Sequence, residues 1–138
     1  MCRCCRDIVL IHSFAVAASM GCRHGNSPLR VVIMGTVNFQ GEAVIDGQIR
    51  FIPQSNTLGP VSIEPIRGGR YRCDHAGGVP VGKHRVEILA WNPRAAEPIG
   101  PGLPPRPQFL PAKYNAHSEL FVSIEKTSNP LVRDFNLN

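Results

Sequence analysis

The residues with the most reactive side chains lie in two short stretches of the sequence. Cys73-Asp74-His75 offers three metal-ligating groups in succession, and Lys113-Tyr114-Asn115 is followed closely by His117 and Glu119. Neighbouring side chains of a strand point to opposite faces, so Cys73 and His75 can share a face that His84 or His117 would have to complete. This leaves a transition-metal site open as an alternative. Because a recognisable four-ligand motif is missing, we expect no metal and no other cofactor.

The second stretch lacks the grouping that catalysis requires. His117-Ser118-Glu119 matches the His-x-Glu of zinc deaminases, but no Pro-Cys-x-x-Cys follows it. His117 and Ser118 do not make a catalytic pair, because neighbours on one strand diverge and no acid partner is recognisable. We therefore expect a protein that is not an enzyme. The alternative is a small secreted enzyme with an unrecognised metal or nucleophile site.

The first 22 residues have the order of an export signal. Arg3 and Arg6 come first, a mostly apolar stretch runs over residues 8–20, and small residues surround Cys22. The apolar stretch is too short to cross a bilayer as a stable helix. Ser19-Met20-Gly21-Cys22 resembles a bacterial lipobox, in which the cysteine becomes lipidated and begins the mature chain.

These features predict a signal peptide over 1–21, a lipidated Cys22 with a flexible tether over 22–30, and a folded domain over 31–138. The lipid would anchor the domain to a membrane of the cell envelope, exposed to the periplasm or the exterior. Simple secretion and a cytosolic chain with a misassigned start are the alternatives. Cleavage and acylation would leave Cys73 alone, without a disulfide framework.

Length, charge and composition restrict the class of protein. The chain has 138 residues, enough for one domain, and its 13 prolines disfavour long helices. The formal net charge is +5, but the arginines are scattered and form no basic run or aromatic-interleaved patch. We therefore expect no nucleic-acid partner.

Beyond residue 31 the dominant pattern is an alternation of apolar and polar residues with period two, which is typical of half-buried strands. Gln40-Gly41, Asp46-Gly47 and Pro80-Val81-Gly82-Lys83 are predicted as turns. The fold class we expect is all-β, a seven-stranded antiparallel β-sandwich. The predicted strands cover residues 33–39, 48–53, 61–64, 70–73, 83–91, 120–125 and 131–137.

The segment Asn92–Phe109 has no periodicity and contains six prolines and two glycines. Loops of this length are uncommon unless they are functional or disordered. We expect Trp91, Arg94 and Arg106 to form a binding surface for an envelope protein or a glycan. The alternative for Trp91 is an edge residue that covers the core.

Residues 22–138 contain an ordered set of short motifs, which include Gly35-Thr36, Gly69-Arg70-Tyr71, Gly78–Val86, Leu110–Asn115 and Asp134–Leu137. Together these motifs resemble those of a family of small bacterial envelope lipoproteins. Members of that family carry a transthyretin-like (prealbumin-like), carboxypeptidase-regulatory-like β-sandwich directly after the lipid-bearing cysteine. The resemblance implies this fold and location, with a structural or binding role.

Two enzyme families with related sandwiches do not match. Hydroxyisourate hydrolases end in Tyr-Arg-Gly-Ser, whereas this chain ends with residues 134–138, Asp-Phe-Asn-Leu-Asn. Intradiol dioxygenases hold iron with two tyrosines and two histidines. Tyr71 and Tyr114 are present here, but no histidine stands at a recognisable spacing from them.

The motif residues also have a structural interpretation. Pro111 stiffens the end of the long loop, and Tyr71 begins a strand after a glycine turn. Tyr114 offers a large apolar ring whose hydroxyl can bond the main chain. We therefore interpret Lys113 and Tyr114 as part of a structural lead-in to the next strand and not as a reactive cluster.

Overall fold

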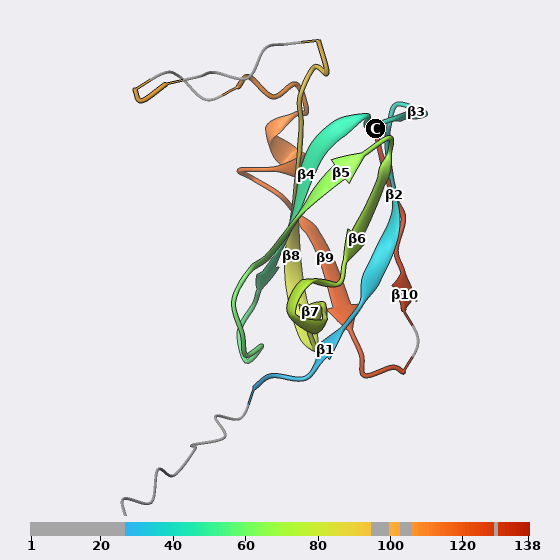
Figure 1. The fold of residues 1–138 in the computed structure, drawn as a ribbon, viewed down its shortest axis with the longest axis vertical. Coiled ribbons are helices and arrows are strands. Elements are labelled where there is room, and N and C mark those ends of the chain that lie inside the picture. The colour runs from blue at the N-terminus through green and yellow to red at the C-terminus, as the bar shows by residue number, and fades with distance from the viewer. Residues whose placement is uncertain (1–26, 95–99, 103–105, 129) are drawn as a thin grey trace, which may run out of the picture.

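The computed structural model describes residues 27–94, 100–102, 106–128 and 130–138; the predicted signal peptide, Cys22 and tether residues 23–26 lie outside them. The described chain is β-structure with two 3₁₀ turns, η1 (His75–Gly77) and η2 (Ala112–Tyr114) (Figure 1). The all-β prediction is confirmed. The strands are β1 (Arg30–Val31), β2 (Ile33–Phe39), β3 (Glu42–Ala43), β4 (Asp46–Pro53), β5 (Ser62–Arg67), β6 (Arg70–Cys73), β7 (Val79–Pro80), β8 (Gly82–Ala90), β9 (Leu120–Ile124), β10 (Leu131–Val132) and β11 (Phe135–Leu137).

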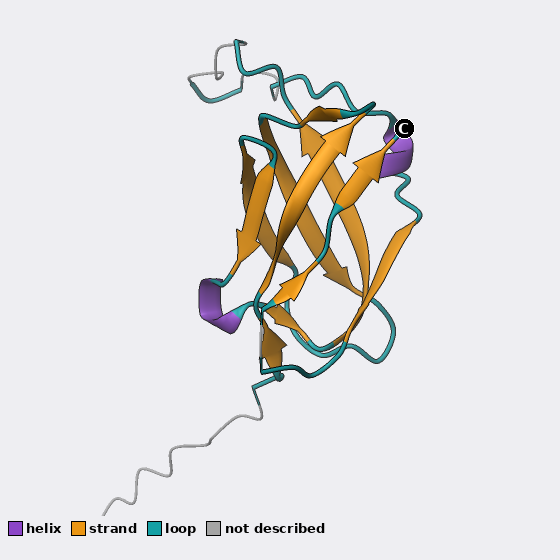
Figure 2. Ribbon diagram, turned by 90° about the vertical axis from the view of Figure 1, so that its right-hand side faces the viewer, coloured by secondary structure: helices purple, strands orange, loops and turns teal. Residues whose placement is uncertain are grey.

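Most of these strands belong to one curled sheet in the order β10-β2-β6-β5-β4-β8-β9 (Figure 2). Strands β3 and β11 pair with β2 in addition, and β1 pairs with β7 in a separate two-stranded sheet. Pairing is antiparallel except for β10 and β11, which run parallel to β2. The prediction of a purely antiparallel fold is therefore wrong at the C-terminus. The reason is that these strands follow a crossover from β9 and not a hairpin.

The core lies inside the curl and follows the predicted alternation. Ile49 and Phe51 of β4 are fully buried, as are Val86, Ile88 and Ala90 of β8. The largest paired surface joins these two strands, whose register runs from Gly47↔Ala90 to Pro53↔His84. Full burial of each large apolar side chain contributes about 1.5–3 kcal/mol to the free energy of unfolding. The period-two pattern therefore places the central strands correctly.

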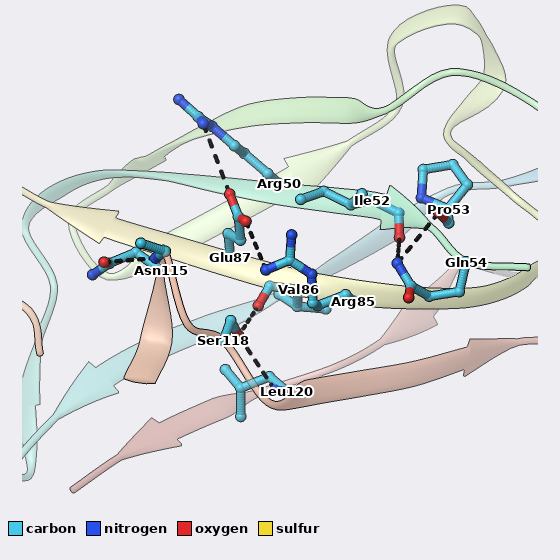
Figure 3. A network of polar contacts seen from close by, with 11 residues as sticks. Arg50, Ile52, Pro53, Gln54, Arg85, Val86, Glu87, Asn115, Ser118 and Leu120 are labelled. Carbon is cyan, nitrogen blue, oxygen red and sulfur yellow. Dashed lines mark hydrogen bonds and ion pairs between the residues drawn. The ribbon is translucent and has the colours of Figure 1, made fainter. Parts of the chain in front are cut away.

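The outer face of the same strands carries charges. Glu87 of β8 lies between two arginines, with Arg85 Nη1 at 2.8 Å and Arg50 Nη1 at 3.8 Å (Figure 3). Below the strand, the Ser118 hydroxyl donates to the Val86 carbonyl and ties the segment before β9 to β8. These polar groups hold β8 to its neighbours from both sides.

Two predicted turns are wrong. Asp46-Gly47 begins β4, and Gly47 is required there because a Cβ would lie 2.4 Å from the Leu89 carbonyl oxygen. Pro80 lies in β7, where it pairs with Arg30, and a bend at Val81 separates it from β8. The predicted turn at Gln40-Gly41 is confirmed, because both residues have positive φ (52° and 83°) between the paired strands β2 and β3.

The predicted strand over 131–137 is divided at Arg133-Asp134, and both of these residues are exposed. At this break the Arg133 carbonyl turns to accept a hydrogen bond from the Tyr71 hydroxyl at 2.8 Å. Gly35 makes the close approach possible, since a Cβ there would lie 1.8 Å from the Arg133 oxygen. The Asp134 carboxylate accepts bonds from the Thr36 amide (2.7 Å) and hydroxyl (2.8 Å), which lower the pKa of Asp134.

One core position is polar. His84 is fully buried against Phe51, and its Nδ1 lies 3.2 Å from the Gly82 carbonyl oxygen. Its Nε2 has no hydrogen-bond partner within the described residues. Burial lowers the pKa of His84 from 6.5, only partly offset by the bond to Gly82. The folded protein therefore favours the neutral imidazole.

This arrangement predicts that stability falls in mild acid. The unfolded chain binds a proton at His84 near pH 6.5, whereas the folded chain binds it only at lower pH. The free energy of unfolding should thus be full above pH 6.5 and decrease as the pH falls through the folded pKa. Replacing His84 by leucine, of similar volume, should flatten this decrease in urea titrations from pH 7.5 to 5.

Glu64 changes the stability with pH in the opposite direction. Burial raises the pKa of its carboxyl group above 4.5, so its contribution to the free energy of unfolding is lost as the pH rises through the pKa of the folded state. The difference between the wild type and His84→Leu at each pH removes this common contribution. An unchanged pH slope in the variant would contradict the role of His84.

Candidate functional site

The long loop leaves and re-enters the sheet at one place. Trp91 directly follows β8 and forms an isolated bridge with Gln108. The Trp91 amide donates to the Asp46 carbonyl (2.9 Å), and the Phe109 amide donates to the Ala90 carbonyl (3.0 Å). Both ends of the loop are therefore fixed to the end of the sheet where β4 begins and β8 ends.

An ion-pair clamp reinforces this attachment. The Asp46 carboxylate binds Arg106 Nη1 at 2.7 Å through one oxygen and Arg67 Nη1 through the other. Arg106 Nη2 also donates to the Asn92 carbonyl at 2.5 Å, which joins the returning end of the loop to its exit. The Arg106 and Asp46 side chains are only 8% and 14% exposed, so solvent screens this pair less than a surface pair.

The clamp changes the interpretation of the predicted binding surface. Trp91 and Arg106 are brought together, with the guanidinium carbon 5.7 Å from the centre of the indole ring. However, the charge of Arg106 is directed at Asp46 and not at solvent. Trp91 is half-buried, and Arg94 is exposed with its amide bound to the Asn92 side-chain oxygen at 2.9 Å. Trp91 and Arg94 therefore remain accessible, while Arg106 holds the loop.

An aromatic cluster lies beside this clamp at the same end of the domain. The Phe39 ring centre is 6.2 Å from that of Phe109 and 6.3 Å from that of Tyr114. Lys113 Nζ lies 4.9 Å from the centre of the Tyr114 ring, and Phe109 is 53% exposed. The sequence alone does not indicate this cluster, because only the fold brings the partly buried Phe39 next to the exposed Phe109. The one sequence feature that could have indicated the cluster is the aromatic residue Phe109 at the end of a proline-rich loop.

The two predicted structural tyrosines both bind the C-terminal strand. The Tyr114 hydroxyl donates to the Asn138 carbonyl oxygen and accepts from the Asn138 amide at 2.8 Å, while Tyr71 binds Arg133. Burial raises the pKa of Tyr71, so its hydroxyl remains a donor at neutral pH. Pro111 precedes η2, and its carbonyl accepts from Asn115 Nδ2 at 3.1 Å. Within Lys113-Tyr114-Asn115, the Tyr114 side chain thus binds the main chain of Asn138, and the Asn115 side chain binds the main chain of Pro111.

The candidate ligands of the first stretch are not brought together. Cys73 is buried, and burial, assisted by the Glu64 and Asp74 carboxylates, raises the pKa of its thiol to about 12. The thiol therefore stays protonated at neutral pH and is a weak nucleophile. His75 is exposed in η1, whereas His84 lies in the core. In the described part of the chain no three histidine, cysteine or carboxylate side chains are placed to hold one metal ion.

Comparison of the chain with protein-family models, curated proteins and solved structures finds no match. Across the described ranges no helix combines the length and apolar character needed to span a bilayer.

The tyrosine contacts predict a graded effect of removing each hydroxyl. Tyr114→Phe removes two bonds to Asn138 and should lower the free energy of unfolding by about 1–3 kcal/mol. Tyr71→Phe removes one bond to Arg133 and should cost about 1 kcal/mol. Urea unfolding of both variants at pH 7.5 measures these values. Unchanged stability in both would show that the hydroxyls do not hold the C-terminal strand.

Proposed function

We propose that the protein is a non-catalytic binding or structural module of the bacterial cell envelope, held at a membrane by a lipid on Cys22. The observation that carries the proposal is that the side chains able to react stabilise the fold instead. Tyr71 and Tyr114 bind main-chain groups of the C-terminal strand, and the buried Cys73 thiol has its pKa raised to about 12. These groups stabilise the fold in states unsuited to attack a substrate.

We infer that the fold is a two-layer sandwich of the transthyretin-like type. Strands β5 and β6 share a single residue pair, Arg67↔Arg70, at the glycine turn. The chain on one side of this corner contributes β6, β2, β10 and β11, and the other side contributes β5, β4, β8 and β9. Because only one residue pair joins the two groups of strands, the sheet can be described as two layers that face a common core (Figure 2).

The placement of the loop supports a binding role. The chain enters the domain at the β1 end, and the long loop lies at the opposite end (Figure 1). The eight Cα–Cα steps from Cys22 to Arg30 can span at most about 29 Å when the chain is fully extended. A lipid on Cys22 would thus keep the β1 end near the membrane and present Trp91, Arg94 and Phe109 to the envelope space. Aromatic and arginine side chains of this kind dominate the binding energy of many protein interfaces.

The anchoring part is tested by Cys22→Ser in the full-length protein expressed in a bacterium. The wild type should sediment with membranes and gain the mass of acyl chains after loss of residues 1–21, because several buried chains give stable anchoring. The variant should appear in the soluble fraction without that mass. A wild type that is soluble, or whose intact mass retains the first 21 residues, would remove the lipid proposal.

The binding part is tested by Trp91→Ala with Phe121→Ala as its control. Phe121 is 51% exposed on β9, away from the loop, so the control also removes one exposed aromatic ring. Envelope proteins or glycans captured by the wild type should be lost with Trp91→Ala, by about tenfold or more in affinity if the indole is central to the interface, and kept with Phe121→Ala. Identical capture by both variants would exclude the loop end as the binding surface.

A further inference from the structure

A groove crosses the outer face of the sheet. Its volume is about 590 Å³, and it spans strands β5, β6, β2 and β10. The side chains that define it are Arg67, Arg70, Arg72, Met34, Pro65 and Val132.

The three arginines concentrate positive charge on a short hairpin. Arg67 and Arg70 are directly opposite each other in the β5–β6 register. Two like charges at such a pair destabilise a sheet, so the arrangement opposes the stability of the hairpin. Arg72 lies two residues further along β6, on the same face and about 6.7 Å away along the strand.

The neighbouring acids neutralise these charges unequally. Arg67 binds Asp46, a carboxylate that Arg106 also shares, and Arg72 Nε binds Asp74 at 2.7 Å. The Arg70 side chain is exposed and has no hydrogen bond or ion pair with any described residue. The acid in the groove lining is Asp134, whose carboxylate already binds the Thr36 amide and hydroxyl. The groove therefore retains excess positive charge centred on Arg70.

The floor between these charges is apolar. Met34 contributes its thioether, to which Arg72 Nη1 donates at 3.4 Å, and Pro65 and Val132 form the two walls. Val132 is 54% exposed. Methionine adapts its shape to varied partners, which suits a surface that accepts polypeptide side chains.

We propose that this groove binds an extended acidic segment of a partner polypeptide, with two carboxylates separated by one residue. Side chains two apart in an extended chain lie on one face about 6.7 Å apart, which matches the spacing of Arg70 and Arg72. The segment would run along β6, with Pro65 of β5 on one side of it and Val132 of β10 on the other. Charge complementarity identifies the partner as anionic, and the spacing favours an extended peptide over a lipid surface, which does not enter a groove.

The proposal is tested by fluorescence anisotropy with the full-length protein and two labelled peptides of identical composition. In Leu-Ser-Glu-Ser-Glu-Ser-Val the glutamates are two residues apart, and in Leu-Ser-Glu-Glu-Ser-Ser-Val they are adjacent. The first peptide should bind saturably and more tightly than the second, and the affinity should fall as salt rises, because the pairs are exposed. Vesicles of anionic phospholipid should not compete.

Arg70→Glu should weaken binding of the first peptide by about tenfold or more, because it replaces attraction by repulsion. Its unfolding midpoint should stay the same or rise, since glutamate opposite Arg67 replaces a like-charge pair. The control is Lys126→Glu, which makes the same charge change at an exposed residue in the segment after β9.

Several results would overturn the proposal. Equal affinity for the two peptides, or equal losses in Arg70→Glu and Lys126→Glu, would reveal a general attraction of acids to a basic protein. Competition by anionic vesicles would identify a lipid surface as the occupant. Lack of saturable binding by the wild type, or a lower unfolding midpoint of Arg70→Glu, would also contradict it.

Discussion

The parallel pairing of the C-terminal strand with β2 is the constraint on which the rest of the fold depends. Phe135↔Val37 and Leu137↔Phe39 join residues 98 positions apart in the sequence. Since closing so long a stretch of chain costs conformational entropy, the strand needs bonds beyond the ladder itself. Tyr71 supplies one at Arg133 and Tyr114 supplies two at Asn138. The two tyrosine hydroxyls thereby hold the C-terminal strand in place.

The break between β10 and β11 shows how local geometry serves this constraint. Gly35 lets the Arg133 carbonyl approach β2 closely enough to turn toward Tyr71. The Thr36 amide then loses a main-chain acceptor, and the Asp134 carboxylate takes its place. Three short motifs that are separate in the sequence therefore form one hydrogen-bonded unit, with a glycine, a tyrosine and an aspartate each required for a different physical reason.

Much of the strand pattern could be predicted from sequence, because one-sided burial imposes an alternation that survives without knowledge of the partners. Ile49 and Phe51 are an example. Long-range contacts could not be predicted in this way. The parallel course of residues 131–137 depends on a crossover that leaves no periodic signal. The dipeptide Asp46-Gly47 is typical of a turn, whereas the reason for Gly47 is its close contact with Leu89. Arg106 was expected to face a partner, yet only the fold reveals Asp46 beside it.

The position of β2 has a consequence for how the polypeptide matures. This strand emerges early during synthesis, yet one of its edges stays unpaired until residues 131–138 have left the ribosome. Before that moment neither tyrosine has its acceptor, and the nascent chain cannot reach its final closed form. The second edge of β2 is therefore covered only once residues 131–138 are available, and until then this open edge can pair with another chain.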